Sequence, residues 1–453
     1  MMPYEPGPYD IVLEAATVLT VNETNPVIED GLIGVKGDRI ALLAPRKSAP
    51  ISVQSRRRIR LEGRVITPGF VNIHTHMILT MVRGVAEDMG FAPAYTPGVP
   101  HGHDVNPEQA RALAQLGALE AMLFGSTLIN DTYVHADVIT GAMAELGLRV
   151  ISCGRIHDAD FSKVADGIWT HDPAIGDRTL QAALDLKSKW HGKENGRIGV
   201  QLAAHAPDTC SVRLLRQVAA ASCAHQLRVN THLAQSRSEV ERIKQRDGKT
   251  PVELLEETGL LNDWLTAAHC LFLTPKDIVR AGHAGMTVAH IPKGNATGGT
   301  MAQTGPLRRA GARLGLGTDN MHADMIEVMR WGLAIGRIQE EKVSDFWQPR
   351  HVLRMATLSG AEAIGLDREI GSLAIGKKAD LVILDFRRPH LTPCINPMGN
   401  LVHTAQGRDV EMVLVDGRIV VENGRATLVN EEEIRRKADR AAAELWEEAR
   451  RGH

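Results

Sequence analysis

The chain has 453 residues, enough for a large buried core, and 43% of them are hydrophobic. Its formal net charge is only −2 with both signs mixed along the chain, which argues against a nucleic-acid surface or an anionic-membrane binder. Because no basic segment followed by an apolar one opens the sequence and no apolar run reaches bilayer length, we expect a cytoplasmic protein. The five cysteines show no Cys-x-x-Cys spacing and are most simply reduced thiols.

Short apolar runs separated by turn residues open the chain and return near its end. The early runs are at 11–13, 18–21, 32–35 and 40–43, and the late ones are at 379–384 and 413–421. Runs of this length between Gly- and Asp-containing turns are typical of β-strands. We predict one small β-sandwich assembled from residues 1–66 and 367–453. A mixed-charge helix over Glu431–Arg451 ends the chain and is expected to be solvated or to contact a second subunit of a homo-oligomer.

Residues 67–366 alternate apolar strands with helical patterns, such as those at 107–124 and 178–190. The first strand is read as one continuous run over Val65–His76. With it the candidate strands number eight, and the other seven end at Asp131, Cys153, His205, His232, His269, His290 and Asp319. Eight strand–helix units over about 300 residues predict an α/β fold, a (β/α)8 TIM barrel with insertions. A doubly wound sheet also alternates in this way, but no Gly-x-Gly-x-x-Gly follows a strand.

Polar side chains gather where these strands end. His74 and His76 lie two residues apart, so both imidazoles can point to the same side of the first strand. Five more strands end in His or Asp, and His290 ends another. The carboxyl ends of barrel strands meet at one mouth, and burying so many polar groups there is costly unless they bind something or each other. The pattern predicts a functional centre that includes a metal site.

Five motifs at these positions carry a family resemblance: PGFVNIHTH at 68–76, THLAQ at 231–235, AAHC at 267–270, VAHIPK at 288–293 and LGTDN at 316–320. In order and spacing they resemble the amidohydrolase superfamily over essentially the full chain. The match is strongest to the subgroup that includes triazine hydrolases and nucleobase or adenosine-type deaminases. The resemblance implies a TIM barrel with a β-sandwich, and a metal-dependent hydrolase acting on small molecules at C–N bonds other than peptide bonds.

Carried over residue by residue, the resemblance implies one divalent metal ion held by His74, His76, His232 and Asp319. Zn²⁺ is the first choice, and Fe²⁺ or Co²⁺ also suit these ligands. The metal would lower the pKa of a water in its open position, Asp319 would accept a proton, and His269 would orient the water or steady the oxyanion. Two-metal members carry a lysine near the fourth strand; residues 198–205 contain none, which favours one metal. Since every ligand position is filled, a non-catalytic scaffold protein is the disfavoured alternative.

Gln235 departs from the family pattern. The resemblance places a glutamate there in the deaminase members, and a primary amide cannot transfer a proton at neutral pH. We therefore expect hydrolysis of a urea, carbamate or amide bond in an N-aryl or N-alkyl compound such as a phenylurea. Gln235 would hold the substrate and His269 would carry the proton. A deaminase of an aminated heterocycle (aminopyrimidine, purine or triazine) is the alternative.

The loop at 81–98, together with Gln235, resembles the branch of phenylurea hydrolases and molinate hydrolase. Its Phe, Tyr and Met residues suit a lid over an apolar or aromatic substrate, and a structural connection between strand and helix is the plainer alternative. His205, Arg155 and Asn295 lie at or after strand ends and are the remaining expected substrate contacts.

Overall fold

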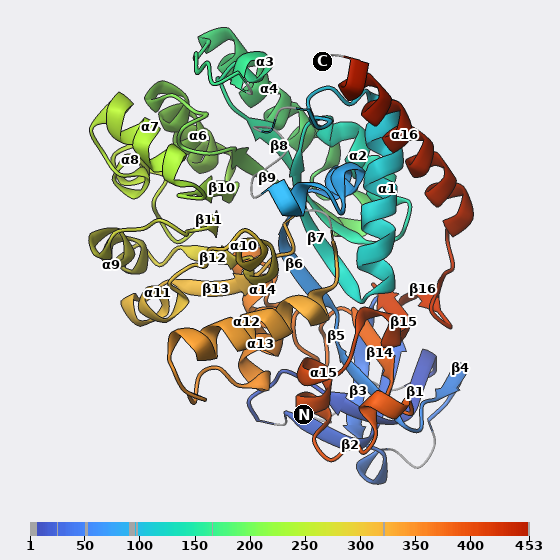
Figure 1. Ribbon diagram of the computed structural model, residues 1–453. Coiled ribbons are helices and arrows are strands. Elements are labelled where there is room, and N and C mark those ends of the chain that lie inside the picture. Colours follow the sequence, from blue (N-terminus) through green and yellow to red (C-terminus); the bar gives the residue numbers. More distant parts are fainter. Residues whose placement is uncertain are drawn as a thin grey trace.

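The computed structural model describes residues 7–24, 26–49, 53–89, 96, 98–164, 166–319 and 322–451. Eight parallel strands of this part form the central barrel (Figure 1). In chain order, which is also their order around the barrel, they are β6 Phe70–Thr75, β7 Ser126–Tyr133, β8 Arg149–Ile156, β9 Ile198–Ala204, β10 Val229–Leu233, β11 Leu265–His269, β12 Thr287–His290 and β13 Arg313–Leu316. The predicted (β/α)8 barrel is confirmed.

Hydrogen bonds between the segments at the carboxyl ends of the first and last strands close the barrel next to the predicted site. Asp319 N–H donates to His74 O (3.0 Å), and His76 N–H donates to Asp319 O (2.7 Å). Thr75 and Asp319 also form a parallel bridge. Barrel closure thus brings residues from the two ends of the domain side by side.

Helices cover the outside of the barrel (Figure 1). Several begin with Pro directly after a side chain that caps the first turn, such as Asn106, Asp172, Thr250 and Thr274. No helix of the described residues has the length and apolar character needed to cross a membrane. The helices of the barrel region are α1 Pro107–Leu123, α2 Ala136–Ala144, α3 Phe161–Val164, α4 Pro173–Trp190, α5 Lys193–Gly196, α6 Val212–His225, α7 Arg237–Asp247, α8 Pro251–Glu257, α9 Pro275–His283, α10 Pro292–Thr297, α11 Thr304–Ala310, α12 Met325–Gln339, α13 Pro349–Met355 and α14 Leu358–Ile364.

A second sheet contains strands from both ends of the chain. Its strand order is β17-β16-β15-β14-β5-β1-β2-β3, and β4 pairs with β1. Leu13 and Ile33 from the N-terminal part share one apolar core with Leu381 and Leu414 from the C-terminal part. The strands are β1 Tyr9–Leu19, β2 Val27–Lys36, β3 Arg39–Pro45, β4 Ser55–Arg60, β5 Arg64–Pro68, β14 Leu381–Asp385, β15 Val410–Val415, β16 Arg418–Glu422 and β17 Arg425–Ala426; helix α15 Pro397–His403 lies between β14 and β15.

The continuous strand predicted over Val65–His76 is wrong. The chain breaks at Pro68 and Gly69 into β5, which pairs with β1 and β14, and β6, which pairs with β7. A Cβ on Gly69 would lie 1.9 Å from the side-chain oxygen of Thr127, so only glycine permits this approach. The apolar run passes from one sheet to the other without a change in hydropathy, which hides the break in the sequence.

The second sheet differs from the prediction at two further points. The runs predicted at 11–13 and 18–21 belong to one strand, β1, which is irregular around Ala15 (φ +66°) and shifts register against β2 there. Strand β4 has no counterpart in the prediction, because its sequence SRRRIR is largely exposed and lacks apolar alternation.

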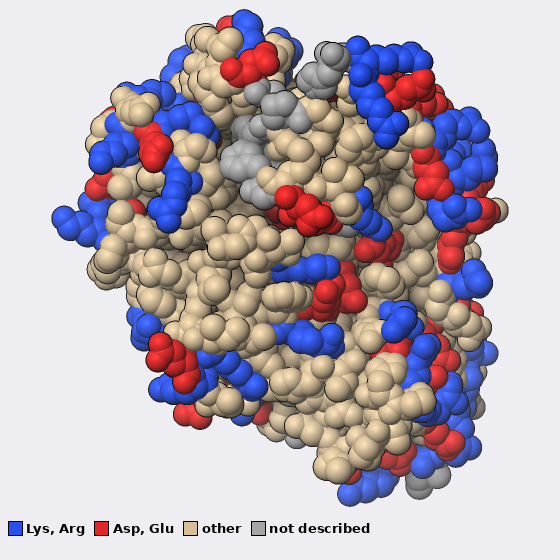
Figure 2. Space-filling model, viewed as in Figure 1, with Lys and Arg blue, Asp and Glu red and all other residues tan. Residues whose placement is uncertain are grey.

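The C-terminal helix α16 has its predicted range, Glu431–Arg451, but one of its faces is buried within the chain. It lies along α1 (Figure 1), and its buried face consists of Ile434, Ala438, Ala441 and Leu445. Trp446 Nε1–H also donates to Met81 O (2.8 Å). This face is therefore neither solvated nor available to a second subunit, while charges of both signs are interspersed along the outer face (Figure 2).

A buried group of charges joins the barrel to the second sheet. Arg149 at the start of β8 pairs with Asp380 (3.1 Å) and with Asp416. Burial alone would lower the pKa of Arg149, but the two carboxylates outweigh it and raise that pKa. The guanidinium is therefore a fixed cation between two acceptors.

Candidate metal centre

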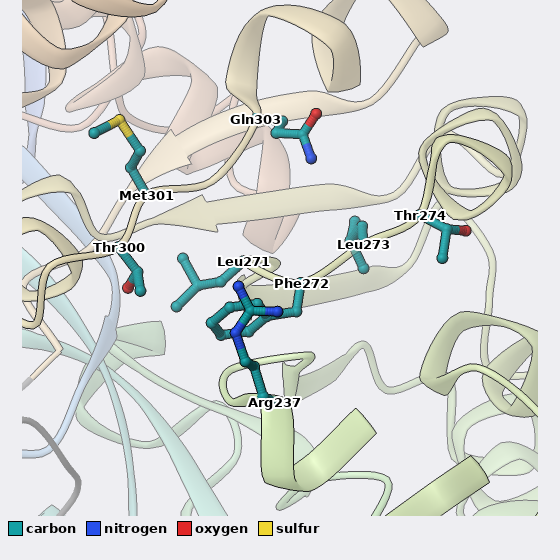
Figure 3. A pocket seen from close by; sticks show the side chains of 8 residues that line it. All are labelled: Arg237, Leu271, Phe272, Leu273, Thr274, Thr300, Met301 and Gln303. Carbon is teal, nitrogen blue, oxygen red and sulfur yellow. The ribbon is translucent and has the colours of Figure 1, made fainter. Parts of the chain in front are cut away.

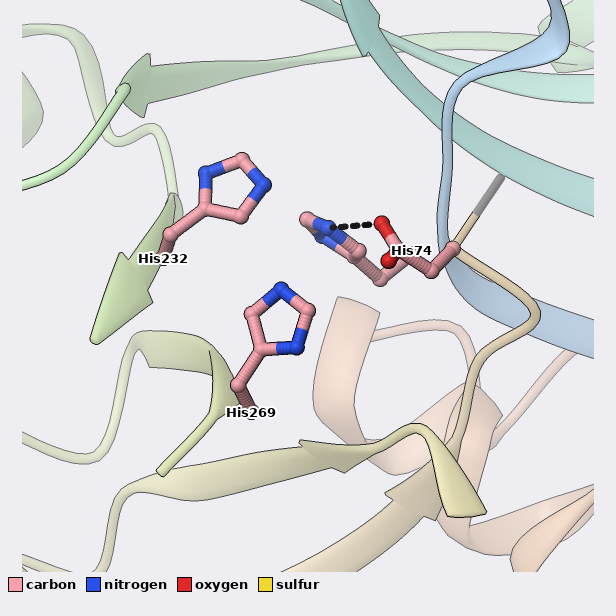
Figure 4. A group of neighbouring side chains, drawn as sticks. His74, His232 and His269 are labelled. Carbon is pink, nitrogen blue, oxygen red and sulfur yellow. Dashed lines mark ion pairs between the residues drawn. The ribbon is translucent and has the colours of Figure 1, made fainter. Parts of the chain in front are cut away.

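Five of the predicted side chains meet inside the mouth of the barrel. One potential ligand atom each of His74, His232, His269 and Asp319 lies within 4.8 Å of the others (Figure 4). His76 belongs to the same group, since its Nε2 lies 3.1 Å from His232 Nε2 and 3.4 Å from Asp319 Oδ1. They come from β6 and the residue that follows it, from β10 and β11, and from the loop after β13, so they converge only in the folded barrel.

The spacing of these atoms suits the ligands of a single ion. Two ligands about 2.1 Å from a tetrahedral ion lie about 3.4 Å apart. Nε2 of His76 is 3.1 and 3.4 Å from its two neighbours, and Nε2 of His74 is 3.7 Å from Asp319 Oδ1. Three imidazole nitrogens with one carboxylate oxygen are a donor set that catalytic sites use when they keep one position open. His269 lies close enough to contact a molecule at that position.

Protein oxygens hold the other ring nitrogen of each of these imidazoles. The pairs are His76 Nδ1 with Thr132 O, His232 Nδ1 with His205 O at 2.7 Å, and His74 Nδ1 with Asn230 Oδ1 at 3.2 Å. Because a carbonyl oxygen only accepts, Nδ1 of His76 and of His232 carries the proton and each Nε2 keeps a lone pair. Two lone pairs 3.1 Å apart repel each other unless a cation lies between them. This is the arrangement of histidines that bind a metal through Nε2.

Burial keeps the imidazoles of His76 and His232 neutral. It lowers the pKa of His76 to about 3, and it lowers the pKa of His232 well below its ordinary value. Burial raises the pKa of Asp319, but the adjacent imidazoles of His74, His76 and His269 outweigh burial and hold that pKa below its ordinary range. Neutral imidazoles and an ionised carboxylate are the forms that bind a cation.

Three residues at the ends of these strands have a backbone conformation that L-residues rarely adopt. The angle φ is +49° at Ala234, +72° at His269 and +64° at Asp319. Such strain costs about 1–3 kcal/mol per residue and is concentrated at functional sites.

Asn295 and His205 lie beside the group, as their strand-end positions predict. Asn295, in α10, has its Oδ1 3.0 Å from His269 Nδ1, and its Nδ2 has no partner among the described residues. His205 follows β9, is buried, and has its Nδ1 2.9 Å from Thr209 Oγ1. Asn295 therefore fixes the ring of His269 and retains a donor for another molecule.

The backbone of Gln235 is fixed by hydrogen bonds to a buried glutamate. Its N–H and that of Ala234 donate to the two carboxylate oxygens of Glu239, each at 2.8 Å. Glu239 is buried, and burial raises its pKa to about 8. The half-buried side chain of Gln235 is thus presented from a fixed loop.

Arg155 lies outside the metal-ligand group. It is buried on β8, where its Nη1 lies 2.8 Å from His103 Nε2 and its guanidinium lies over the ring of Tyr133 at 4.3 Å. Tyr133 in turn has its ring centre 5.5 Å from that of His76. One aromatic side chain therefore separates Arg155 from the predicted ligands.

Two further strand-end residues are buried with incomplete hydrogen bonding among the described residues. Asp131 accepts from Met77 N–H (2.7 Å) at Oδ1, its Oδ2 has no partner, and burial raises its pKa to about 7. His290 has no partner for either ring nitrogen, and burial lowers its pKa to about 4.

Three residues near the site have no counterpart in the prediction. Asn230 shares the inward face of β10 with His232, two residues further on, so strand periodicity could have identified it. Tyr133 has the same relation to Asp131 on β7. Phe161, on the short helix α3, has no comparable signal in the sequence.

Part of the predicted lid at 81–98 lies outside the described residues, namely 90–95 and 97, which include Phe91 and Tyr95. Elsewhere a groove of about 380 Å³ is lined by Arg237, which follows β10, and by residues after β11 and β12 (Figure 3). The guanidinium of Arg237 lies 4.8 Å from the ring centre of Phe272. No predicted site residue lines this groove, so it is separate from the metal-ligand group.

The model of the amidohydrolase family matches residues 65–420. The chain belongs to this family. A 5-methylthioadenosine/S-adenosylhomocysteine deaminase of Moorella thermoacetica is 35% identical over 436 residues, which cover 94% of this amidohydrolase and 97% of the relative. A 5′-deoxyadenosine deaminase of Methanothermobacter thermautotrophicus is 35% identical over 392 residues, covering 84% and 88%. Family membership makes this chain a hydrolase of C–N bonds other than peptide bonds.

Solved structures share the fold of this amidohydrolase. An adenosine deaminase from Xanthomonas campestris with bound zinc has a TM-score of 0.87 at 24% identity, covering 97% of this chain and 99% of that one. The atrazine chlorohydrolase from Arthrobacter aurescens, complexed with zinc, has a TM-score of 0.85 at 22% identity, covering 95% and 100%. At this identity the likeness concerns the fold alone.

Proposed function

We propose that this amidohydrolase deaminates an adenosine derivative modified at the 5′ position. The observation that carries the proposal is the match to deaminases of such nucleosides at 35% identity over most of both chains. The deaminase alternative is therefore preferred to the phenylurea hydrolysis expected from Gln235 and the loop at 81–98. The convergent donors at the barrel mouth support it, because hydrolytic release of ammonia needs an activated water.

A divalent ion held by His74, His76, His232 and Asp319 would supply the Lewis acidity that lets water ionise near neutral pH. The ionised carboxylate of Asp319 can take the proton that the attacking water loses. His269 has its Nδ1 fixed by Asn295, which leaves Nε2 to hydrogen-bond the oxygen that is added to the ring carbon. The carbon–oxygen bond forms, the carbon–nitrogen bond breaks, and the amino group leaves as ammonia.

Because residue 235 is a glutamine, a different residue must protonate the leaving nitrogen. Its amide can donate and accept hydrogen bonds but cannot transfer a proton. In this chain the proton taken up by Asp319 has to reach the leaving nitrogen from Asp319 itself or through His269. Gln235 would hold the heterocycle by hydrogen bonds.

Gln235 also favours a second candidate, the hydrolysis of a urea, carbamate or amide such as a phenylurea. A weakly basic aryl amine needs less help from an acid when it leaves than a basic amine does. A site without the carboxylic acid suits such a leaving group.

The two candidates release different products from the metal-loaded protein. We expect ammonia from 5′-methylthioadenosine or 5′-deoxyadenosine, and an ammonia assay with the absorbance change of the purine measures it. Release of aniline from a phenylurea without ammonia from either nucleoside would refute the deaminase proposal. Asp319→Asn should abolish either activity, whereas the exposed Asp345→Asn should leave it unchanged.

A further inference from the structure

Helix α7 differs from three other helices of the barrel in how its first turn is closed. In α1, α8 and α9 the side chain of the third helical residue accepts a hydrogen bond from the backbone N–H of the helix's own N-cap residue. In α7 the third residue is Glu239, and its carboxylate reaches past the N-cap Ser236 to the two residues before it. Both oxygens of Glu239 are therefore bound to the chain that precedes the helix.

Two hydrogen bonds from Glu239 hold the segment between β10 and α7. Oε1 accepts from Ala234 N–H and Oε2 accepts from Gln235 N–H, each at 2.8 Å. Glu239 and Ala234 are both fully buried, so water does not compete for these bonds. Ala234 has φ +49°, a conformation that a residue with a Cβ keeps only when its surroundings impose it. The carboxylate supplies two of the contacts that impose it.

The segment held by Glu239 lies between two strand ends of the metal-ligand group. His232 lies two residues before Ala234, on β10. On the other side, Ala234 O accepts from Leu271 N–H (3.2 Å) and Phe272 N–H (3.1 Å), which follow His269 at the end of β11. A movement of this segment would therefore change the position of Gln235 relative to both imidazoles.

The carboxyl group of Glu239 is costly to bury at this place. No lysine or arginine of the described residues lies within 4.0 Å of it, and Arg242, three residues further along α7, pairs instead with Asp208 (2.6 Å). Burial, together with the nearby Asp208, raises the pKa of Glu239 to about 8. Since a buried acid without a cation contributes little to stability, the consequence of Glu239 is geometric: it fixes two successive peptide groups.

We propose that Glu239 is a positioning residue that fixes Gln235 relative to the metal-ligand group. Its two oxygens prevent rotation of the peptide groups on which the side chain of Gln235 depends for its direction. A displacement of about 1 Å in a site can lower a rate about 100-fold, so the alignment of this side chain matters to the reaction. That Gln235 holds the heterocycle of a nucleoside rests on the proposed function.

A cycle of two substitutions tests whether Glu239 acts through Gln235. Glu239→Gln keeps the size of the side chain but replaces one acceptor by an N–H donor, which cannot pair with a backbone N–H. With 5′-methylthioadenosine and the metal-loaded full-length protein, Glu239→Gln and Gln235→Ala should each lower kcat/KM about 10-fold. The double variant should also lose about 10-fold, whereas independent effects would multiply to about 100-fold. Glu239→Asp, which keeps both acceptors on a shorter side chain, should recover part of the loss.

Asp277→Asn is the matched control for a buried acid at the start of a helix. Asp277 is the third residue of α9, is buried like Glu239, and accepts from the N–H of its own N-cap Thr274 (3.0 Å). Its replacement should leave Gln235 in place, so the effects of Asp277→Asn and Gln235→Ala on kcat/KM should multiply. Metal content should stay full in every variant, because His205 O holds Nδ1 of His232.

Hydrogen–deuterium exchange tests the held segment without a substrate. Mass spectrometry of peptides covering residues 231–238 should show exchange about 10-fold faster in Glu239→Gln than in the wild type, because the N–H groups of Ala234 and Gln235 lose their acceptors. Peptides covering residues 240–247 should exchange as in the wild type. Equal exchange at 231–238, or exchange that is faster along all of α7, overturns the proposal.

The kinetic results can also overturn the proposal. An unchanged kcat/KM in Glu239→Gln does so, as does multiplication of its effect with that of Gln235→Ala, or a loss of activity that follows a loss of metal. If neither 5′-methylthioadenosine nor 5′-deoxyadenosine is deaminated, the proposed function fails, and the exchange measurement still decides whether Glu239 holds this segment.

Discussion

Replacing Gln235 by Glu tests whether the missing acid limits deamination by this protein. The substitution keeps the size of the side chain and adds a group that can hold a proton. The loop should keep its shape, because its fixed points are backbone N–H groups of Ala234 and Gln235 that donate to Glu239. The comparison therefore isolates proton transfer from positioning.

The expected rise in kcat/KM equals what one added proton-transfer group contributes to the rate. General acid–base catalysis by a positioned side chain contributes about 10²–10⁴-fold, which corresponds to roughly 3–5 kcal/mol of activation free energy. The half-buried position of Gln235 leaves the new carboxyl partly in water, which limits how far burial can raise its pKa towards the pH of the reaction. We therefore expect the lower end of this range, about a 100-fold rise in kcat/KM for ammonia release.

The assay is steady-state ammonia release from 5′-methylthioadenosine by the metal-loaded wild type, Gln235→Glu and Gln235→Ala. Metal content is measured for each protein, so that a change in ligand geometry is not mistaken for chemistry. A rate for Gln235→Glu that equals or falls below the wild-type rate, with full metal content, would refute the reasoning. Another group would then already protonate the leaving nitrogen, and Gln235 would act only in holding the substrate.

Three other substitutions probe the site and the fold. Asn230→Ala should weaken metal binding about 10- to 100-fold in competition with a chromogenic chelator, because Asn230 orients His74. Burial raises the pKa of Asp131 to about 7, so the folded state binds more protons than the unfolded state between about pH 4 and 7, and stability is lost as the pH rises through 7. Urea unfolding should show the wild type losing about 3 kcal/mol more than Asp131→Asn between pH 5 and 8. Arg149→Met should lower the free energy of unfolding at pH 7 by roughly 3–5 kcal/mol, because Asp380 keeps a buried charge without its partner.

Each of the three predictions, for Asn230, Asp131 and Arg149, has an outcome that would contradict it. Equal metal affinity of Asn230→Ala and the wild type would show that the 3.2 Å contact does not orient the ligand. Parallel stability curves between pH 5 and 8 would show that Asp131 is ionised in the folded protein at both values. For Arg149, the matched control is Arg387→Met, which removes an exposed arginine from its pair with Asp385 and should change stability little. An equal effect of the two substitutions would mean that burial of the pair is unimportant.

The barrel could be predicted from the sequence because two independent signals coincide at each strand. The strands are apolar runs buried on both faces, and most of them end in His or Asp at the same mouth. The break at Gly69 could not be predicted, because the residues on both sides are equally apolar and the constraint is the approach of Thr127 from another strand. Strand β4 could not be predicted either, since arginines on an exposed strand carry no hydrophobic period.

The side chains that converge at the mouth were predictable, whereas the groups that orient them were only partly so. His76 and His232 are fixed by the backbone oxygens of Thr132 and His205, and a backbone oxygen leaves no trace in the residue types. Asn230 was predictable in principle from its place two residues before His232.

The metal-ligand group and its surroundings constrain different parts of the reaction. The imidazoles and Asp319 suit any hydrolysis in which water attacks an electron-poor carbon, so they are compatible with both candidate reactions. Gln235 bears on the leaving group, since it removes one proton donor. A leaving amine that is weakly basic depends less on such a donor than the amino group of a purine does. Measuring which amine the same metal-loaded protein releases therefore separates the two reactions, which the metal-ligand group alone cannot do.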